Sequence, residues 1–139
     1  MSVLRTVAGI CYAAHALILI AIGLRYVRSK EFQPYHAVAL GRDWNSLDPA
    51  LQVLLLTFIR GIGALLFAIA ISTLALLIFP FREGATWANY ALPLPLLVSA
   101  VTALWGTKSI ASATSAPTPV NQAWVTIGLT VIAFLLSFF

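Results

Sequence analysis

The amino-acid sequence predicts an all-α protein, a bundle of four transmembrane helices whose first loop lies partly in the membrane interface. Of its 139 residues 61% are hydrophobic and 9% are charged, and soluble domains carry roughly half and a quarter. The mean hydropathy is +0.98. Lipid accepts an apolar exterior, whereas a small soluble protein needs polar residues on most of its surface. We therefore expect a single integral membrane domain over residues 1–139.

The first expected span covers residues 3–24, an almost unbroken apolar stretch. At about 1.5 Å per residue, this stretch is long enough to cross the hydrocarbon core. A cleavable signal peptide is the alternative, but no small-residue cleavage site follows Ala21, and three further apolar runs come later. We interpret the stretch as a retained helix.

The polar segment 25–48 is expected to lie partly in the interface. Pro34 suits the first turn of a short helix, and Gly41 suits its left-handed end. Aromatic rings with a polar atom favour the headgroup level, and the interfacial candidates are Tyr35, His36 and Trp44. His36 could exchange protons or bind a phosphate group there, or it could simply be solvated.

Three more spans follow, at residues 50–79, 85–105 and 119–139. Asp48 and Pro49 form a cap and first-turn pair at the start of the second span. This span would be about 45 Å long, so it must tilt or protrude. A tight turn is expected after Pro80. The Ser-, Thr- and Pro-rich stretch 106–122 reads as an irregular loop.

The positive charges near the span ends predict an orientation, because cytoplasmic loops carry the excess of Lys and Arg. One side carries Arg25, Arg28, Lys30, Arg42 and Lys108, and the other carries Arg5 and Arg82. We expect a bacterial cytoplasmic membrane protein with both termini outside and with loops 25–48 and 106–118 in the cytoplasm. Trp87, Trp105 and Trp124 fall near span ends, where an aromatic belt is expected.

Arg60 is the main candidate for a functional residue, since it lies well inside the second span and no acidic residue lies inside any span. A buried, unpaired cation is costly in a membrane, so it needs a reason. Small residues follow Arg60 on one helical stripe, at Ala64, Ala68 and Ser72. Such a stripe lets another helix approach closely, which predicts that this face points into the bundle.

A polar pocket between the first three spans is geometrically possible, because counting along two antiparallel helices places His15 at the depth of Arg60. Its candidate ligand-binding residues are Arg60, His15, Tyr12, Thr57, Asn89 and Tyr90. The structural alternative is that Arg60 extends toward the loop and that His15 is a neutral residue bonded between helices.

The residues that several classes of function require are absent from this sequence. The basic residues are scattered, so no nucleic-acid site is expected. One cysteine, Cys11, excludes an internal disulfide. No metal-ligand cluster, cofactor motif or catalytic triad occurs, so no metal, cofactor or catalytic residue is predicted. A proton-coupled exporter would need an acidic residue inside a span, and none lies there in this sequence, so this function is not expected.

The sequence resembles a group of short, functionally uncharacterised bacterial membrane proteins with four helices. The residues that carry this resemblance lie in the first two thirds of the chain: Pro34-Tyr35-His36, Leu40-Gly41, Trp44, Leu47, Gln52, Arg60-Gly61, Gly63, Pro80-Phe81-Arg82, Gly84 and Trp87-Ala88. The resemblance implies the four-helix fold but no activity. Members of the group carry more arginine near Arg82, which would favour the reverse orientation.

Three functions stay open at this point. The leading hypothesis is a bundle that binds a lipid-like amphiphile, with its head near Arg60 and its tail along the small-residue stripe. The second is an accessory or assembly subunit whose helices dock on partner helices or on a second copy. The third is a membrane-embedded enzyme that uses His15, Cys11 or Tyr12 as an acid or a base.

Overall fold

The computed structural model describes residues 2–139 and confirms an all-helical fold, with no strand among these residues. The helices are α1 (Val3–Val27), α2 (Pro34–Leu40), α3 (Pro49–Leu76), α4 (Ala88–Ala91), α5 (Pro93–Ala113) and α6 (Val120–Leu136). A 3-10 turn, Trp44–Ser46, precedes α3, and a π-helical turn, Leu77–Phe81, follows it.

Within residues 2–139, three helical segments are long and apolar enough to cross a membrane: α1, α3 with its π turn (Pro49–Phe81), and α4 with α5 (Ala88–Ala113). These segments are compatible with a membrane protein. Helix α6 is equally apolar but has 17 residues. At about 1.5 Å per residue it is roughly 26 Å long, slightly less than the hydrocarbon core of a bilayer.

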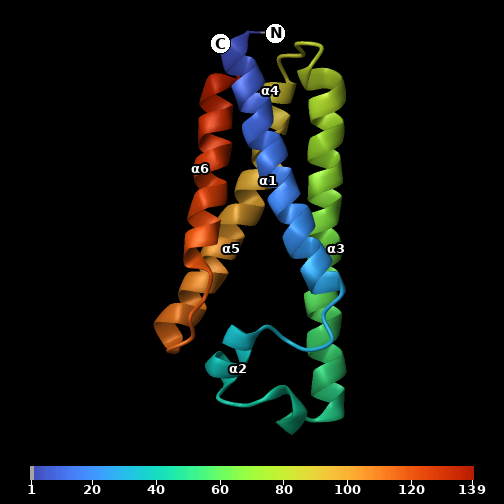
Figure 1. The fold of residues 1–139 in the computed structure, drawn as a ribbon, viewed down its shortest axis with the longest axis vertical. Helices are drawn as coiled ribbons and strands as arrows, with labels where there is room; N and C mark the ends of the chain where they lie inside the picture. The colour runs from blue at the N-terminus through green and yellow to red at the C-terminus, as the bar shows by residue number, and fades with distance from the viewer. Residues whose placement is uncertain (1) are drawn as a thin grey trace.

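The long helices run up and down beside one another (Figure 1). Helix α1 packs against both α3 and α6, and α6 packs against α5. The long helices therefore pack side by side in the order α3, α1, α6, α5. Within residues 2–139, α3 has no extensive packing against α5 or α6. Both termini lie at one end, near the turn that follows α3, while α2 and the α5–α6 loop lie toward the other end (Figure 1).

Two predicted helix starts and one predicted stop are confirmed. The Asp48 carboxylate accepts a hydrogen bond from the Ala50 N–H at 2.8 Å, which caps α3. Helix α2 begins at Pro34 and ends where Gly41 adopts a φ of 64°. This left-handed conformation suits glycine and terminates the helix.

Two other boundaries differ from prediction. Residues 106–113 were expected in a loop but belong to α5, and there Thr107 donates its hydroxyl hydrogen bond to the Ala103 carbonyl at 2.8 Å. A threonine satisfied in this way is tolerated inside a helix. Pro80 does not end the helix abruptly, because it lies inside the π turn Leu77–Phe81.

Helices α1 and α3 touch at two glycines. A Cβ atom added to Gly63 would lie 2.8 Å from the Gly23 carbonyl oxygen. The backbones thus meet with no room for a side chain between them, as small residues permit in membrane helices. This contact fixes the register of α1 against α3.

The predicted inward face of α3 is wrong. Ala64, Ala68 and Ser72 are exposed, whereas the buried positions of α3 are Ile59, Gly63, Ala70 and Thr73. Both stripes have helical spacing and small residues, so periodicity alone does not distinguish them. Burial follows the stripe that contains Gly63, because that residue allows α1 to approach.

Candidate functional site

Arg60 does not reach into the centre of the bundle. Its Nε and Nη2 atoms donate hydrogen bonds to the Ser29 carbonyl oxygen at 3.2 and 2.9 Å. Ser29 lies just after α1, so the guanidinium satisfies a carbonyl at the C-terminal end of that helix. Arg60 itself is an exposed residue on the loop side. This arrangement matches the structural alternative for Arg60.

His15 lies elsewhere, and its expected proximity to Arg60 is wrong. Ser29, the partner of Arg60, follows His15 by 14 residues along the chain, which corresponds to about 20 Å along a helix. The depth estimate failed because α3 extends beyond the end of α1 at this side (Figure 1). The Gly23–Gly63 contact and the Arg60–Ser29 hydrogen bonds give the true register of the two helices.

His15 instead joins α1 to α6. Its Nδ1 atom lies 2.7 Å from the Thr130 hydroxyl oxygen, and that hydroxyl donates to the Thr126 carbonyl at 3.0 Å. The single hydroxyl proton is thereby engaged, so Nδ1–H of His15 is the donor in the other bond. Both side chains are fully buried. The pair is an interhelical hydrogen bond.

The other members of the expected pocket do not gather around Arg60 either. Tyr12 is fully buried with its ring edge against Phe81, and Asn89 is 4% exposed. Thr57 is exposed and donates to the Val53 carbonyl of its own helix. Tyr90 is 58% exposed and lies beside Phe138. Within residues 2–139, no hydrogen bond joins any of these side chains to Arg60, whose guanidinium bonds to Ser29.

Arg5 is a structural anchor that the sequence did not single out. Its Nη1 atom donates to the Ser137 carbonyl at 3.0 Å, and its Nη2 atom donates to the Phe81 carbonyl at 3.1 Å. The guanidinium carbon also lies 4.3 Å from the centre of the Phe81 ring. Arg5 therefore ties α1 to the ends of α3 and α6. A basic residue near the start of an apolar run is so common that it carried no signal.

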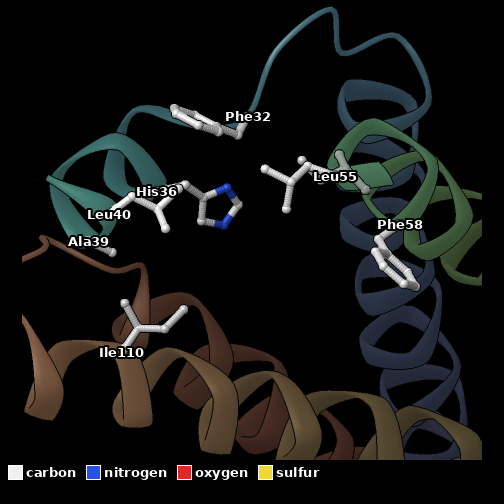
Figure 2. A pocket seen from close by; sticks show the side chains of 8 residues that line it. Phe32, His36, Ala39, Leu40, Leu55, Phe58 and Ile110 are labelled. Atoms are coloured by element: carbon white, nitrogen blue, oxygen red, sulfur yellow. The ribbon is translucent and has the colours of Figure 1, made fainter. Parts of the chain in front are cut away.

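One cavity lies between α2, α3 and α5. It has a volume of about 310 Å³, within the usual range for small-ligand sites. We call it the α2 cavity, and its lining residues are Phe32, His36, Ala39, Leu40, Leu55, Phe58, Ile59 and Ile110. Figure 2 shows the His36 ring pointing from α2 toward Leu55 and Phe58, with Ile110 across the space. His36 is the one polar side chain among them.

The hydrogen bonds of α2 set the protonation of His36. The Gln33 N–H donates to His36 Nδ1 at 3.2 Å, so Nδ1 is the unprotonated nitrogen. A neutral ring then carries its proton on Nε2, and the one hydrogen bond of the ring within residues 2–139 is the one at Nδ1. Burial in apolar surroundings lowers the pKa of His36. The neutral ring therefore offers one N–H donor in an otherwise apolar cavity.

Aromatic contacts hold α2 in this position. The Tyr35 and Tyr26 hydroxyls lie 3.2 Å apart, which links α2 to α1. Phe32 packs its ring edge to face with Trp44 at 5.1 Å between centroids. Gln52 of α3 donates to the Trp44 carbonyl at 2.9 Å. The interfacial candidates Tyr35, His36 and Trp44 thus form one cluster, although the sequence did not show that a cavity lies beside it.

Among residues 2–139, no group of three His, Cys, Asp or Glu side chains is placed to bind a metal ion. No family model, no curated protein and no solved structure matches this chain. The resemblance to short bacterial four-helix proteins therefore stays a prediction.

Proposed function

We propose that this chain is a membrane protein with four spans that binds a lipid-like amphiphile in the α2 cavity. The observation that carries the proposal is the single N–H donor of His36 within an apolar lining. Such a site matches a molecule with one hydrogen-bond acceptor, such as an ester, carbonyl or hydroxyl oxygen, next to a hydrocarbon chain. The proposed head position moves from Arg60 to His36, since Arg60 is already bonded to Ser29.

The depth of the cavity supports an amphiphile. Exposed tryptophans mark the interfacial level of membrane helices, and Trp105 on α5 is 72% exposed. Ile110 of the α2 cavity lies five residues beyond it on the same helix. Trp124 on α6 lies beside Lys108 of α5, whose Nζ atom is 5.4 Å from the centre of the Trp124 ring. The α2 cavity would then lie at the headgroup level of the membrane.

Helix α6 completes the four spans in this proposal. It packs along α1 and α5, which are both long and apolar enough to cross. A helix of 17 residues is at the lower limit for a span, and the flanking residues can extend to the interface. The end of the bundle that holds the α2 cavity carries most of the basic residues, so we propose that this end faces the bacterial cytoplasm.

Photo-crosslinking in nanodiscs tests the proposal. The probe is an uncharged monoacylglycerol whose acyl chain carries a diazirine, and mass spectrometry maps the labelled residues. We expect labelling on Phe58 and Ile110, and a several-fold loss when Leu55→Trp fills the cavity. Leu65→Trp is the matched control, because Leu65 is 66% exposed outside the cavity. Equal labelling in both variants would overturn the proposal.

A role as an accessory subunit is the second candidate, and one observation favours it. The small residues Ala64, Ala68 and Ser72 leave a narrow outer face on α3 that has no partner within residues 2–139. Such a face suits close packing of another helix. Extraction in mild detergent followed by native mass spectrometry distinguishes the two: a stoichiometric complex with another protein supports this role, and a monomer or homodimer that carries lipid supports amphiphile binding.

A further inference from the structure

Three buried side chains in the bundle carry a polar atom that has no hydrogen-bond partner within residues 2–139: the Tyr12 hydroxyl, Nε2 of His15 and Oδ1 of Asn89. Tyr12 and His15 are fully buried, and Asn89 is 4% exposed. A fourth such atom, Nε of Arg5, belongs to the anchor described above. Buried polar atoms without a partner cost free energy, so they are rare in native structures and usually bind ordered water. The three side chains therefore mark a polar site in the core.

The three side chains come from two helices that meet in one buried cluster. Tyr12 and His15 are one turn apart on α1, so they lie on the same face of that helix. Ala88 and Leu92, on either side of Asn89, belong to the same buried cluster as Tyr12. Figure 1 shows α4 alongside the N-terminal half of α1. The fold thus brings Asn89 toward the face of α1 that carries the other two side chains.

The hydrogen-bonding capacity of this site requires a molecule that donates as well as accepts. Nδ1–H of His15 donates to Thr130, so Nε2 of the same ring is an acceptor. The side-chain oxygen of Asn89 is an acceptor too. Its main-chain carbonyl lacks the usual helical donor, because Pro93 four residues later has no N–H. The Tyr12 hydroxyl has a single proton to donate, so acceptors outnumber donors and the bound molecule must supply hydrogen atoms.

Water meets this requirement, because it both donates and accepts and commonly bonds to buried polar groups in this way. The acceptor groups disfavour an anion, and no acidic residue lies inside any span to attract a cation. We infer that Tyr12, His15 and Asn89 bind ordered water, which joins α4 to α1 as the hydrogen bond between His15 and Thr130 joins α6 to α1. None of the three side chains lines the α2 cavity, so this site is independent of amphiphile binding.

Nitrogen NMR of ring-labelled histidine in nanodiscs tests the site at His15. The chain has two histidines, so His15 is the one left to observe in the His36→Gln variant. We expect Nε2 to resonate where a hydrogen-bonded imine nitrogen does. Tyr12→Phe and Asn89→Leu should each move it toward the position of a free imine nitrogen, because each removes a partner of the bound water. Tyr90→Phe is the matched control and should move nothing, since Tyr90 follows Asn89 in the chain and is 58% exposed.

Hydroxyl-radical footprinting with X-rays separates bound water from direct pairing of the side chains. The radicals form from water, so a ring inside the bundle is oxidised where water lies beside it. We expect Tyr12 to be oxidised several-fold more than Phe67, after correction for the intrinsic reactivity of each ring. Phe67 is the control, because its ring lies beside Gly23 in the apolar contact between α3 and α1. Asn89→Leu should lower the oxidation of Tyr12 several-fold.

The outcomes decide the water site without depending on how the variants fold. A free Nε2 of His15 overturns it. A bonded Nε2 with Tyr12 oxidised no more than Phe67 shows that the side chains pair directly, which also overturns it. Both readouts are taken with Tyr12, His15 and Asn89 in place, so a misfolded variant at the site does not blur them. Either failure leaves amphiphile binding in the α2 cavity standing, and loss of photolabelling there leaves the water site standing.

Discussion

The backbones of Gly23 and Gly63 touch across the α1–α3 contact, and neither position has room for a Cβ atom. At Gly63 that atom would meet the Gly23 carbonyl oxygen at 2.8 Å and the Tyr26 Cβ at 2.9 Å. A backbone cannot move aside as the end of a long side chain can. This contact positions the end of α1, and through it Ser29 and the first loop.

Gly63→Ala should therefore destabilise the protein despite the better helix propensity of alanine. We expect a loss of about 1–3 kcal/mol, the usual cost of overpacking. Gly61→Ala is the control, since nothing lies within 4 Å of an added Cβ there. It should be neutral or stabilising by up to about 1 kcal/mol. Thermal unfolding in one detergent measures both, and equal stability of the two variants would contradict a tight crossing.

The hydrogen bond between His15 and Thr130 should contribute measurably to the packing of α6 on α1. Thr130→Val keeps the shape but leaves the buried Nδ1–H of His15 without its acceptor. We expect a loss of about 1–2 kcal/mol. Thr57→Val is the control, because Thr57 is exposed and bonds only within its own helix. A double-mutant cycle with His15→Leu isolates the pair, and a coupling energy near zero would refute the bond.

Arg60 should act on the end of α1 rather than on a ligand. Arg60→Gln removes the charged donor from the Ser29 carbonyl, which we expect to cost about 1 kcal/mol. Hydrogen exchange should become faster in residues 24–33, while labelling by the monoacylglycerol probe changes less than twofold. Arg82→Gln, an exposed arginine at the other end, is the control. A large loss of labelling with unchanged exchange would instead return Arg60 to the ligand site.

The sequence located most of the helices but not the contacts between them. Apolar runs and the caps at Pro34, Gly41 and Asp48 located the helices, because these signals are local. The faces of α3 could not be assigned, since two small-residue stripes satisfy the same spacing and the choice depends on a glycine in another helix. The pairing of His15 with Thr130 joins residues 115 positions apart, and no local pattern encodes it.

The candidate site could be predicted only in part. Tyr35, His36 and Trp44 were expected at the headgroup level from composition, and they cluster in the structure. The cavity beside them needs Ile110 of α5 as its far wall. The sequence placed residues 106–122 in an irregular loop, so it offered no wall there and no cavity could be inferred.

His36 should make amphiphile binding depend on pH. Its ordinary pKa is about 6.5, and burial lowers it in the folded protein. The folded ring therefore resists a proton that the unfolded ring accepts, so the contribution of His36 to stability is constant above about pH 7 and is lost as the pH falls below about 6.5. Protonation would also take the acceptor from the Gln33 N–H and loosen the start of α2. No charged side chain lines the α2 cavity to oppose this effect.

We expect labelling by the uncharged monoacylglycerol probe to be constant from pH 8 to about pH 7 and to decline several-fold toward pH 5. His36→Gln should weaken labelling modestly but remove its pH dependence, because an amide both donates and accepts without titrating. NMR titration of ring-labelled histidine in nanodiscs measures the pKa directly. A pKa of His36 at or above 6.5 would contradict its burial against α3 and α5.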